Sequence, residues 1–104
     1  MDPREQKYLD MISQFPESPL GQFSLGRYLV EVGRFREAIA PLEHCLAEDP
    51  DWTAAMVSLG DALAGTGEAA RAAEIWRRAR STAQAQSHGS LAQDIEERLA
   101  DLVQ

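Results

Sequence analysis

The chain lacks most of the features that would point to secretion, redox chemistry or a membrane anchor. Its 104 residues include a single cysteine, Cys45, so an internal disulfide cannot form, and this fits a reducing compartment. No long hydrophobic run follows the polar segment 1–7, which argues against a signal peptide and a membrane span. We therefore expect a cytoplasmic protein of one small domain.

Positive charge is also scarce. The chain has 10 lysines and arginines against 17 aspartates and glutamates, which gives a formal net charge of -7. Binding to nucleic acid requires a basic face that displaces counterions from phosphates, and an anionic membrane surface also attracts basic proteins. The composition therefore predicts a partner that is neither nucleic acid nor membrane.

Motifs for catalytic, metal or cofactor chemistry are missing as well. His44 and Cys45 are adjacent and would diverge on a helix, and the other histidine, His88, is far away in the sequence. The sequence has no glycine-rich phosphate loop and no His-Glu-x-x-His motif. Its carboxylates lie in solvated runs, without a pair suited to acid–base chemistry. We predict a protein that is not an enzyme and has no catalytic residue, metal ligand or cofactor.

What the sequence does contain is an internal repeat with a spacing of 34 residues. Leu25 and Gly26 recur as Leu59 and Gly60, Leu29 as Leu63, Gly33 as Gly67, Ala38 as Ala72, and Leu42 as Trp76. A fixed period of this length indicates that one supersecondary unit has been copied and stacked.

Apolar residues recur at intervals of three and four, which predicts helices throughout. Glycine and proline divide the chain into about six antiparallel helices, over residues 3–14, 19–32, 35–48, 52–64, 68–83 and 91–103. Expected N-caps are Asp2 with Glu5 reaching back, Ser18, Asp51, and Ser90 with Gln93. Gly26 and Gly60 predict places where a neighbouring helix passes too close for a side chain.

The repeated residues resemble the tetratricopeptide repeat. Its pattern is matched by Leu25, Gly26, Leu29, Ala38, Leu42 and Pro50, and again by Leu59, Gly60, Leu63, Ala72 and Trp76, with Gln84 at the second proline position. The resemblance covers residues 19 to about 84 and implies an all-α, right-handed superhelix. Tyr8, Met11 and Pro16 match the back half of a repeat. We therefore expect a half-repeat helix over 1–18, repeats over 19–52 and 53–86, and a capping helix over 87–104, where Glu96 takes the place of the close-packing glycine.

In this family the front helices form a concave groove that binds peptides. The resemblance assigns to the groove Leu20, Phe23, Ser24, Arg27, Val30 and Glu31 from the first repeat, Ala54, Val57, Ser58, Asp61 and Ala64 from the second, and Trp52 at their junction. Phe23, Arg27 and Trp52 are the strongest candidates, because aromatic residues and arginine are enriched at binding hot spots. The alternative is that Phe23 and Trp52 only cover seams between helices.

Charged residues suggest how a partner would be oriented. The carboxylate clamp of some family members is not expected, because its positions hold Phe23, Arg27 and Ser58. Glu97 and Asp101 are expected to join Asp61 in an acidic end of the groove, suited to a partner with an apolar anchor and a basic residue. The cluster Arg71, Arg77, Arg78 and Arg80 is expected to pair with Glu68 and Glu74 on the surface.

These observations predict a non-catalytic module or adaptor that binds a peptide or protein segment in the concave groove. The alternative is a homodimer formed through the terminal helices, with Tyr8, Leu9 and Ile12 as its apolar surface.

Overall fold

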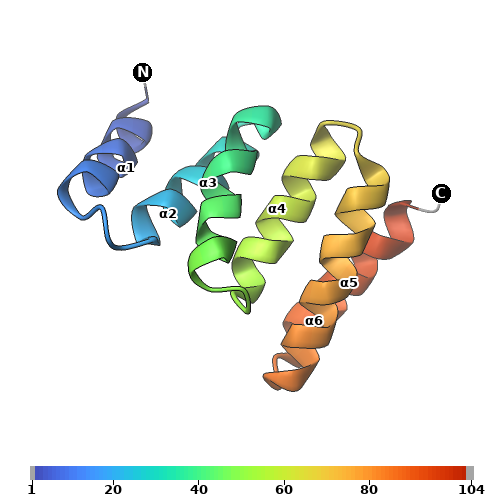
Figure 1. The fold of residues 1–104 in the computed structure, drawn as a ribbon. Helices are drawn as coiled ribbons and strands as arrows, with labels where there is room; N and C mark the ends of the chain where they lie inside the picture. Colours follow the sequence, from blue (N-terminus) through green and yellow to red (C-terminus); the bar gives the residue numbers. More distant parts are fainter. Residues whose placement is uncertain (1, 103–104) are drawn as a thin grey trace.

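The computed structural model describes residues 2–102, and within this range it contains six α-helices and no β-strand (Figure 1). The helices are α1 (Pro3–Gln14), α2 (Leu20–Glu31), α3 (Phe35–Glu48), α4 (Thr53–Gly65), α5 (Ala69–Ala85) and α6 (Gly89–Leu102). The predicted all-α fold of about six helices is confirmed.

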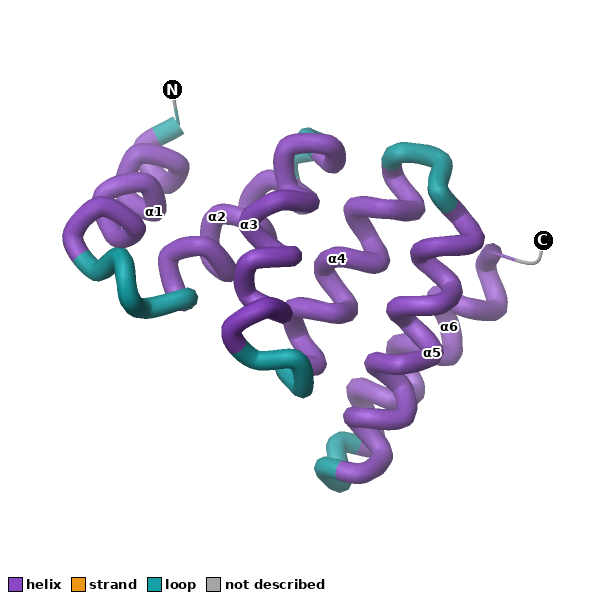
Figure 2. Tube along the Cα trace, viewed as in Figure 1, coloured by secondary structure: helices purple, strands orange, loops and turns teal. Residues whose placement is uncertain are grey.

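The helices stand side by side in chain order, and the turns between them alternate between two edges of the molecule (Figure 2). Successive helices are therefore antiparallel. Each helix packs against the next one, and α2 also contacts α4. The result is an elongated stack of 39 × 28 × 20 Å, with α1 at one end and α5 and α6 at the other (Figure 1).

Most helix boundaries agree closely with those expected, whereas several predicted caps are wrong. The Asp2 carboxylate does cap α1, because it accepts a hydrogen bond from the Arg4 backbone N–H at 2.8 Å. Asp51 does not cap α4, which follows Trp52 without a side-chain cap. α6 begins at Gly89, so the predicted cap Ser90 lies inside its first turn. The expected end of this helix at residue 103 lies outside the described residues.

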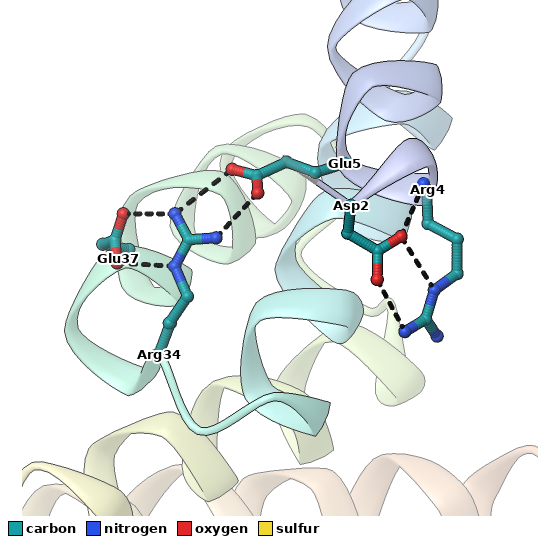
Figure 3. A network of polar contacts seen from close by, with 5 residues as sticks. All are labelled: Asp2, Arg4, Glu5, Arg34 and Glu37. Carbon is teal, nitrogen blue, oxygen red and sulfur yellow. Dashed lines mark hydrogen bonds and ion pairs between the residues drawn. The ribbon is translucent and has the colours of Figure 1, made fainter.

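The predicted capping box at α1 is replaced by a tertiary ion pair. Glu5 does not reach back to Asp2; its carboxylate accepts hydrogen bonds from Arg34 at 2.7 and 3.1 Å. Arg34 lies between α2 and α3 and also binds Glu37 at 2.7 Å (Figure 3). The Glu5 carboxylate binds the Arg34 guanidinium rather than the Asp2 backbone N–H, because the two hydrogen bonds from the guanidinium are charge-assisted and therefore stronger.

This polar network and a few apolar contacts attach α1 to the stack. α1 has no buried residue of its own, and Tyr8 packs on Tyr28 with ring centroids 6.1 Å apart. Tyr8 and Ile12 are partly buried against the core, whereas Leu9 is 37% exposed. The predicted dimer surface on α1 therefore keeps one of its three apolar residues in solvent, and self-association stays a prediction.

The core depends on close contact at the two repeated glycines. A Cβ atom on Gly26 would lie 2.5 Å from Cγ of Leu42, and one on Gly60 would collide with the indole of Trp76. Trp76 is 4% exposed, and its Nε1–H donates a hydrogen bond to the Val57 carbonyl oxygen at 3.2 Å. The prediction that neighbouring helices leave no room for a side chain at these glycines is confirmed.

Gly65 makes a third contact of this kind, which the repeat pattern did not indicate. A Cβ atom at this position would collide with the ring of Phe35 at the start of α3. The residue 34 positions earlier is Glu31, so the repeat gives no sign of a required glycine. Gly65 thus allows α4 to approach α3 closely, whereas Gly60 allows α4 to approach α5 closely.

The turns after α2, α4 and α5 share one conformation. Each has a residue in the left-handed region, namely Gly33 (φ 82°), Gly67 (φ 85°) and Ser87 (φ 61°). The next N–H bonds back to a carbonyl in the last turn of the helix, as in Arg34 to Leu29, Glu68 to Leu63 and His88 to Ala83. The third turn therefore adopts the backbone of the other two without the glycine that favours it.

Replacing Gly60 by alanine should destabilise the protein, because the new methyl group would enter the space of the Trp76 indole. We expect the free energy of unfolding in urea to fall by about 1–3 kcal/mol. Gly89→Ala is the matched control, because a Cβ atom there meets nothing within 4 Å. Equal losses for both variants would contradict the packing role of Gly60.

Replacing Ser87 by glycine should stabilise the protein, because glycine adopts the left-handed conformation without steric cost. We expect the free energy of unfolding to rise by about 0.5–1 kcal/mol. The same change at Ser81, inside α5, should instead lower it by about 0.5 kcal/mol. A loss of stability in both variants would show that the turn at Ser87 is unstrained.

Candidate functional site

A hollow of about 350 Å³ lies on the face where α2, α4 and α6 meet. We call it the concave hollow, and its lining residues are Phe23, Arg27, Val30, Glu31, Ala54, Val57, Ser58, Asp61, Leu91 and Arg98. Phe23, Arg27 and Val30 follow one another at helical spacing along α2, on a different side from the close-packing Gly26. α3 packs against the side of α2 that carries Gly26, and the side that carries Phe23 and Arg27 contributes to this surface.

The structure brings most of the predicted groove residues to the concave hollow. Phe23, Arg27, Val30, Val57, Ser58 and Asp61 all line it. Trp52 lies beside it, in contact with Phe23, and lines a neighbouring hollow. Leu20, by contrast, is 58% exposed at the start of α2 and is not among the lining residues.

Phe23 and Trp52 form an aromatic pair at the border of the hollow. Their ring centroids are 4.7 Å apart and their planes are inclined by 31°. The Arg27 guanidinium carbon lies 5.6 Å from the Phe23 centroid, within the range of a cation–π contact. Both aromatic side chains are only partly buried, so they cover the seam between α2 and α4 and still offer apolar surface to solvent.

Two residues of the lining, Asp61 of α4 and Arg98 of α6, form an ion pair. Arg98 donates from Nε to Oδ1 of Asp61 at 2.7 Å and from Nη2 to Oδ2 at 3.2 Å. This two-pronged geometry is the strong form of an arginine–carboxylate contact. The Asp61 carboxylate correspondingly raises the pKa of Arg98, against the opposing effect of partial burial.

The expected acidic end of the groove is therefore wrong. Arg98 neutralises Asp61, and the residues that α6 contributes to the lining are Leu91 and Arg98 rather than Glu97 and Asp101. No sequence signal pointed to Arg98. If Ile95 is aligned with Leu59, Arg98 falls at the position of Ala62, which is fully buried and does not line the hollow.

Two further hollows adjoin the concave hollow and lengthen the surface. One, of about 190 Å³, lies between α1 and α2 and shares Phe23, Arg27 and Glu31 with it. The other, of about 550 Å³, is bordered by Trp52 and by the turn before α6, and shares Ala54 and Leu91. Each of the two thus shares lining residues with the concave hollow.

Three of the four arginines in the α5 cluster, Arg71, Arg78 and Arg80, make polar contacts within the described residues, and the expected ion pair with Glu74 does not form there. Arg71 pairs with Glu68 at 2.7 Å, as expected, and lies 3.9 Å from Glu43 of α3. Arg80 pairs with Glu96 of α6 at 2.7 Å. Arg78 donates to the Pro50 carbonyl oxygen at 2.6 Å. The contacts to α3, α6 and Pro50 come from distant parts of the sequence, so local spacing could not predict them.

Potential metal ligands, the Cys45 thiol and the apolarity of the helices can also be assessed over residues 2–102. No group of three or more histidine, cysteine or acidic side chains in this range could hold a metal ion. Cys45 is fully buried, its thiol donates to the Pro19 carbonyl oxygen at 3.7 Å, and burial raises its pKa to about 11. A thiol in this state is a poor nucleophile at neutral pH. None of the described helices combines the length and apolarity that crossing a membrane requires.

Comparison with known proteins agrees with the resemblance to the tetratricopeptide repeat. A family model described as tetratricopeptide repeat matches residues 29–94. The TPR repeat-containing protein PA0015 of Pseudomonas aeruginosa is 29% identical over 73 residues, which is 70% of each chain.

Two solved structures superimpose closely on the chain, each at 26% sequence identity. Protein BPP2914 from Bordetella parapertussis has a TM-score of 0.86, with coverage of 99% of this chain and 90% of the other. The TPR2B domain of yeast Sti1, solved in a complex with pHsp70, has a TM-score of 0.87, with coverage of 95% and 79%. The six helices thus form the superhelix that the repeated residues predicted, and the chain belongs to the tetratricopeptide repeat family.

Proposed function

We propose that this protein is a non-catalytic interaction module that binds an extended peptide or protein segment in the concave hollow. The observation that carries the proposal is the partly buried Phe23–Trp52 pair, which lies at the border of a recessed surface beside Arg27. Large aromatic side chains in such settings supply most of the binding energy at protein interfaces. The similar Sti1 domain was solved in complex with a partner, which supports this class of function.

The chemistry of the surface suits a protein segment better than a small molecule. Its three hollows are open and share lining residues, so a chain can lie on α2, α4 and α6 rather than enter a closed cavity. Apolar side chains such as Val30, Val57 and Leu91 alternate with polar ones in the lining. We further propose repeats over 19–52 and 53–86, flanked by a half-repeat over 1–18 and a cap over 87–104, acting in the cytoplasm without a cofactor.

Selection from a phage-displayed library of random 12-residue peptides provides a defined ligand for testing this function. Enriched peptides would be synthesised with a fluorescent label, and their dissociation constants measured by fluorescence polarisation. Replacing Phe23 or Trp52 by alanine should weaken binding about tenfold or more, because each substitution removes an apolar anchor worth over 1 kcal/mol.

Phe15→Ala is the matched control, since Phe15 is a phenylalanine that is 61% exposed and lies away from the concave hollow. It should bind the selected peptides as the natural protein does. If Phe23→Ala and Trp52→Ala retained full affinity, or if all three variants lost it equally, the proposed groove would be wrong.

A further inference from the structure

The Asp61–Arg98 ion pair connects α6 to α4 and also lies in the lining of the concave hollow. It joins residues 37 positions apart in the sequence, and both partners line the concave hollow. Their side chains are 27% and 34% exposed, so the pair borders solvent and would face a bound segment. Both carboxylate oxygens of Asp61 are occupied by the same guanidinium.

The charges that line the hollow are balanced by this contact. The lining contains two arginines, Arg27 and Arg98, and two acidic residues, Glu31 and Asp61. Asp61 is taken by Arg98, and Glu31 lies 3.5 Å from Arg4 of α1. Arg27 forms no ion pair with any residue of 2–102 and lies over the Phe23 ring. Arg27 is therefore the lining cation that remains available to a partner, next to the aromatic pair.

We propose that Arg98 sets the charge preference of the groove. By occupying Asp61, it leaves Arg27 as the lining charge without an ion pair in residues 2–102, since the 67% exposed Glu31 lies 3.5 Å from Arg4. The groove therefore favours segments with an acidic residue beside an apolar or aromatic one. This inference rests on the proposed function of the concave hollow and names the chemistry of its partner. Complementary charge of this kind selects partners and fixes their orientation more than it adds raw affinity.

Removing Arg98 should reverse this preference. The Asp61 carboxylate would then face the bound segment, and the charge of the lining would change from balanced to one net negative charge. The whole chain already carries a net charge of -7, which acts in the same direction. A basic residue in the partner would then be favoured over an acidic one.

The chain offers a closely matched control in Arg80. This residue also pairs with a carboxylate through a 2.7 Å contact and also ties a neighbouring helix to α6, through Glu96. Neither Arg80 nor Glu96 lines the concave hollow. Arg80→Gln and Arg98→Gln therefore remove the same charge and one ion pair to the same helix, and differ in their position relative to the groove.

The test is a parallel selection from the random 12-residue library on the natural protein, Arg98→Gln and Arg80→Gln. The readout is the ratio of acidic to basic residues in the enriched peptides, confirmed by affinities of synthetic peptides that differ in one glutamate or lysine. The natural protein should enrich acidic residues. Arg98→Gln should lower the acidic-to-basic ratio at least about threefold, while Arg80→Gln should leave it unchanged.

A second pair of variants tests whether the change in charge preference comes from the altered charge rather than from a structural change. Asp61→Asn should shift the preference further towards acidic peptides, and combining it with Arg98→Gln should return the ratio to near that of the natural protein. Equal ratios for Arg98→Gln and Arg80→Gln, or a natural protein without charge preference, would overturn the inference while leaving groove binding intact. Failure to enrich any peptide, or undiminished enrichment on the Phe23→Ala and Trp52→Ala variants, would overturn the proposed function itself, and the inference with it.

Discussion

The structure depends on the close approach of paired helices at Gly26 and Gly60. The absence of a side chain at these two positions lets Leu42 and Trp76 fill the space against the helix backbone. Trp76 also satisfies its indole N–H on the Val57 carbonyl oxygen, so a large polar-tipped side chain is buried without an unmet hydrogen bond. These contacts bury one side of α2 and of α4, whereas Phe23 and Arg27 of α2 and Ser58 and Asp61 of α4 line a shared surface.

That shared surface combines an apolar pair with a small number of placed charges. Phe23 and Trp52 contribute the aromatic area, and Arg27 lies over the first of them. α6 does not merely cover the end of the stack, because it adds Leu91 and Arg98 to the lining and ties itself to Asp61 across the hollow. The concave hollow is therefore lined by three helices from different parts of the sequence.

The sequence predicted the features that recur along the chain, but not the tertiary contacts that occur only once. Apolar residues at intervals of three and four predicted the helices, and the 34-residue repeat predicted the close contacts at Gly26 and Gly60. The assignment of Phe23 and Arg27 to one side of α2 came from the resemblance to the tetratricopeptide repeat. Glu5 and Arg98 were misjudged or missed for the opposite reason. Their partners, Arg34 and Asp61, come close only after folding, and no local pattern encodes an ion pair between residues 29 or 37 positions apart.

The two tryptophans of the chain allow a direct measurement of where a partner binds. Trp52 borders the groove, whereas Trp76 is buried between α4 and α5, so their indole N–H signals report on the concave surface and on the core. In a titration of ¹⁵N-labelled protein with a selected peptide, the Trp52 indole signal and the backbone amides of Phe23, Arg27 and Ser58 should shift, with little change at Trp76. Shifts confined to α5, with the Trp52 signal unmoved, would contradict binding in the concave hollow.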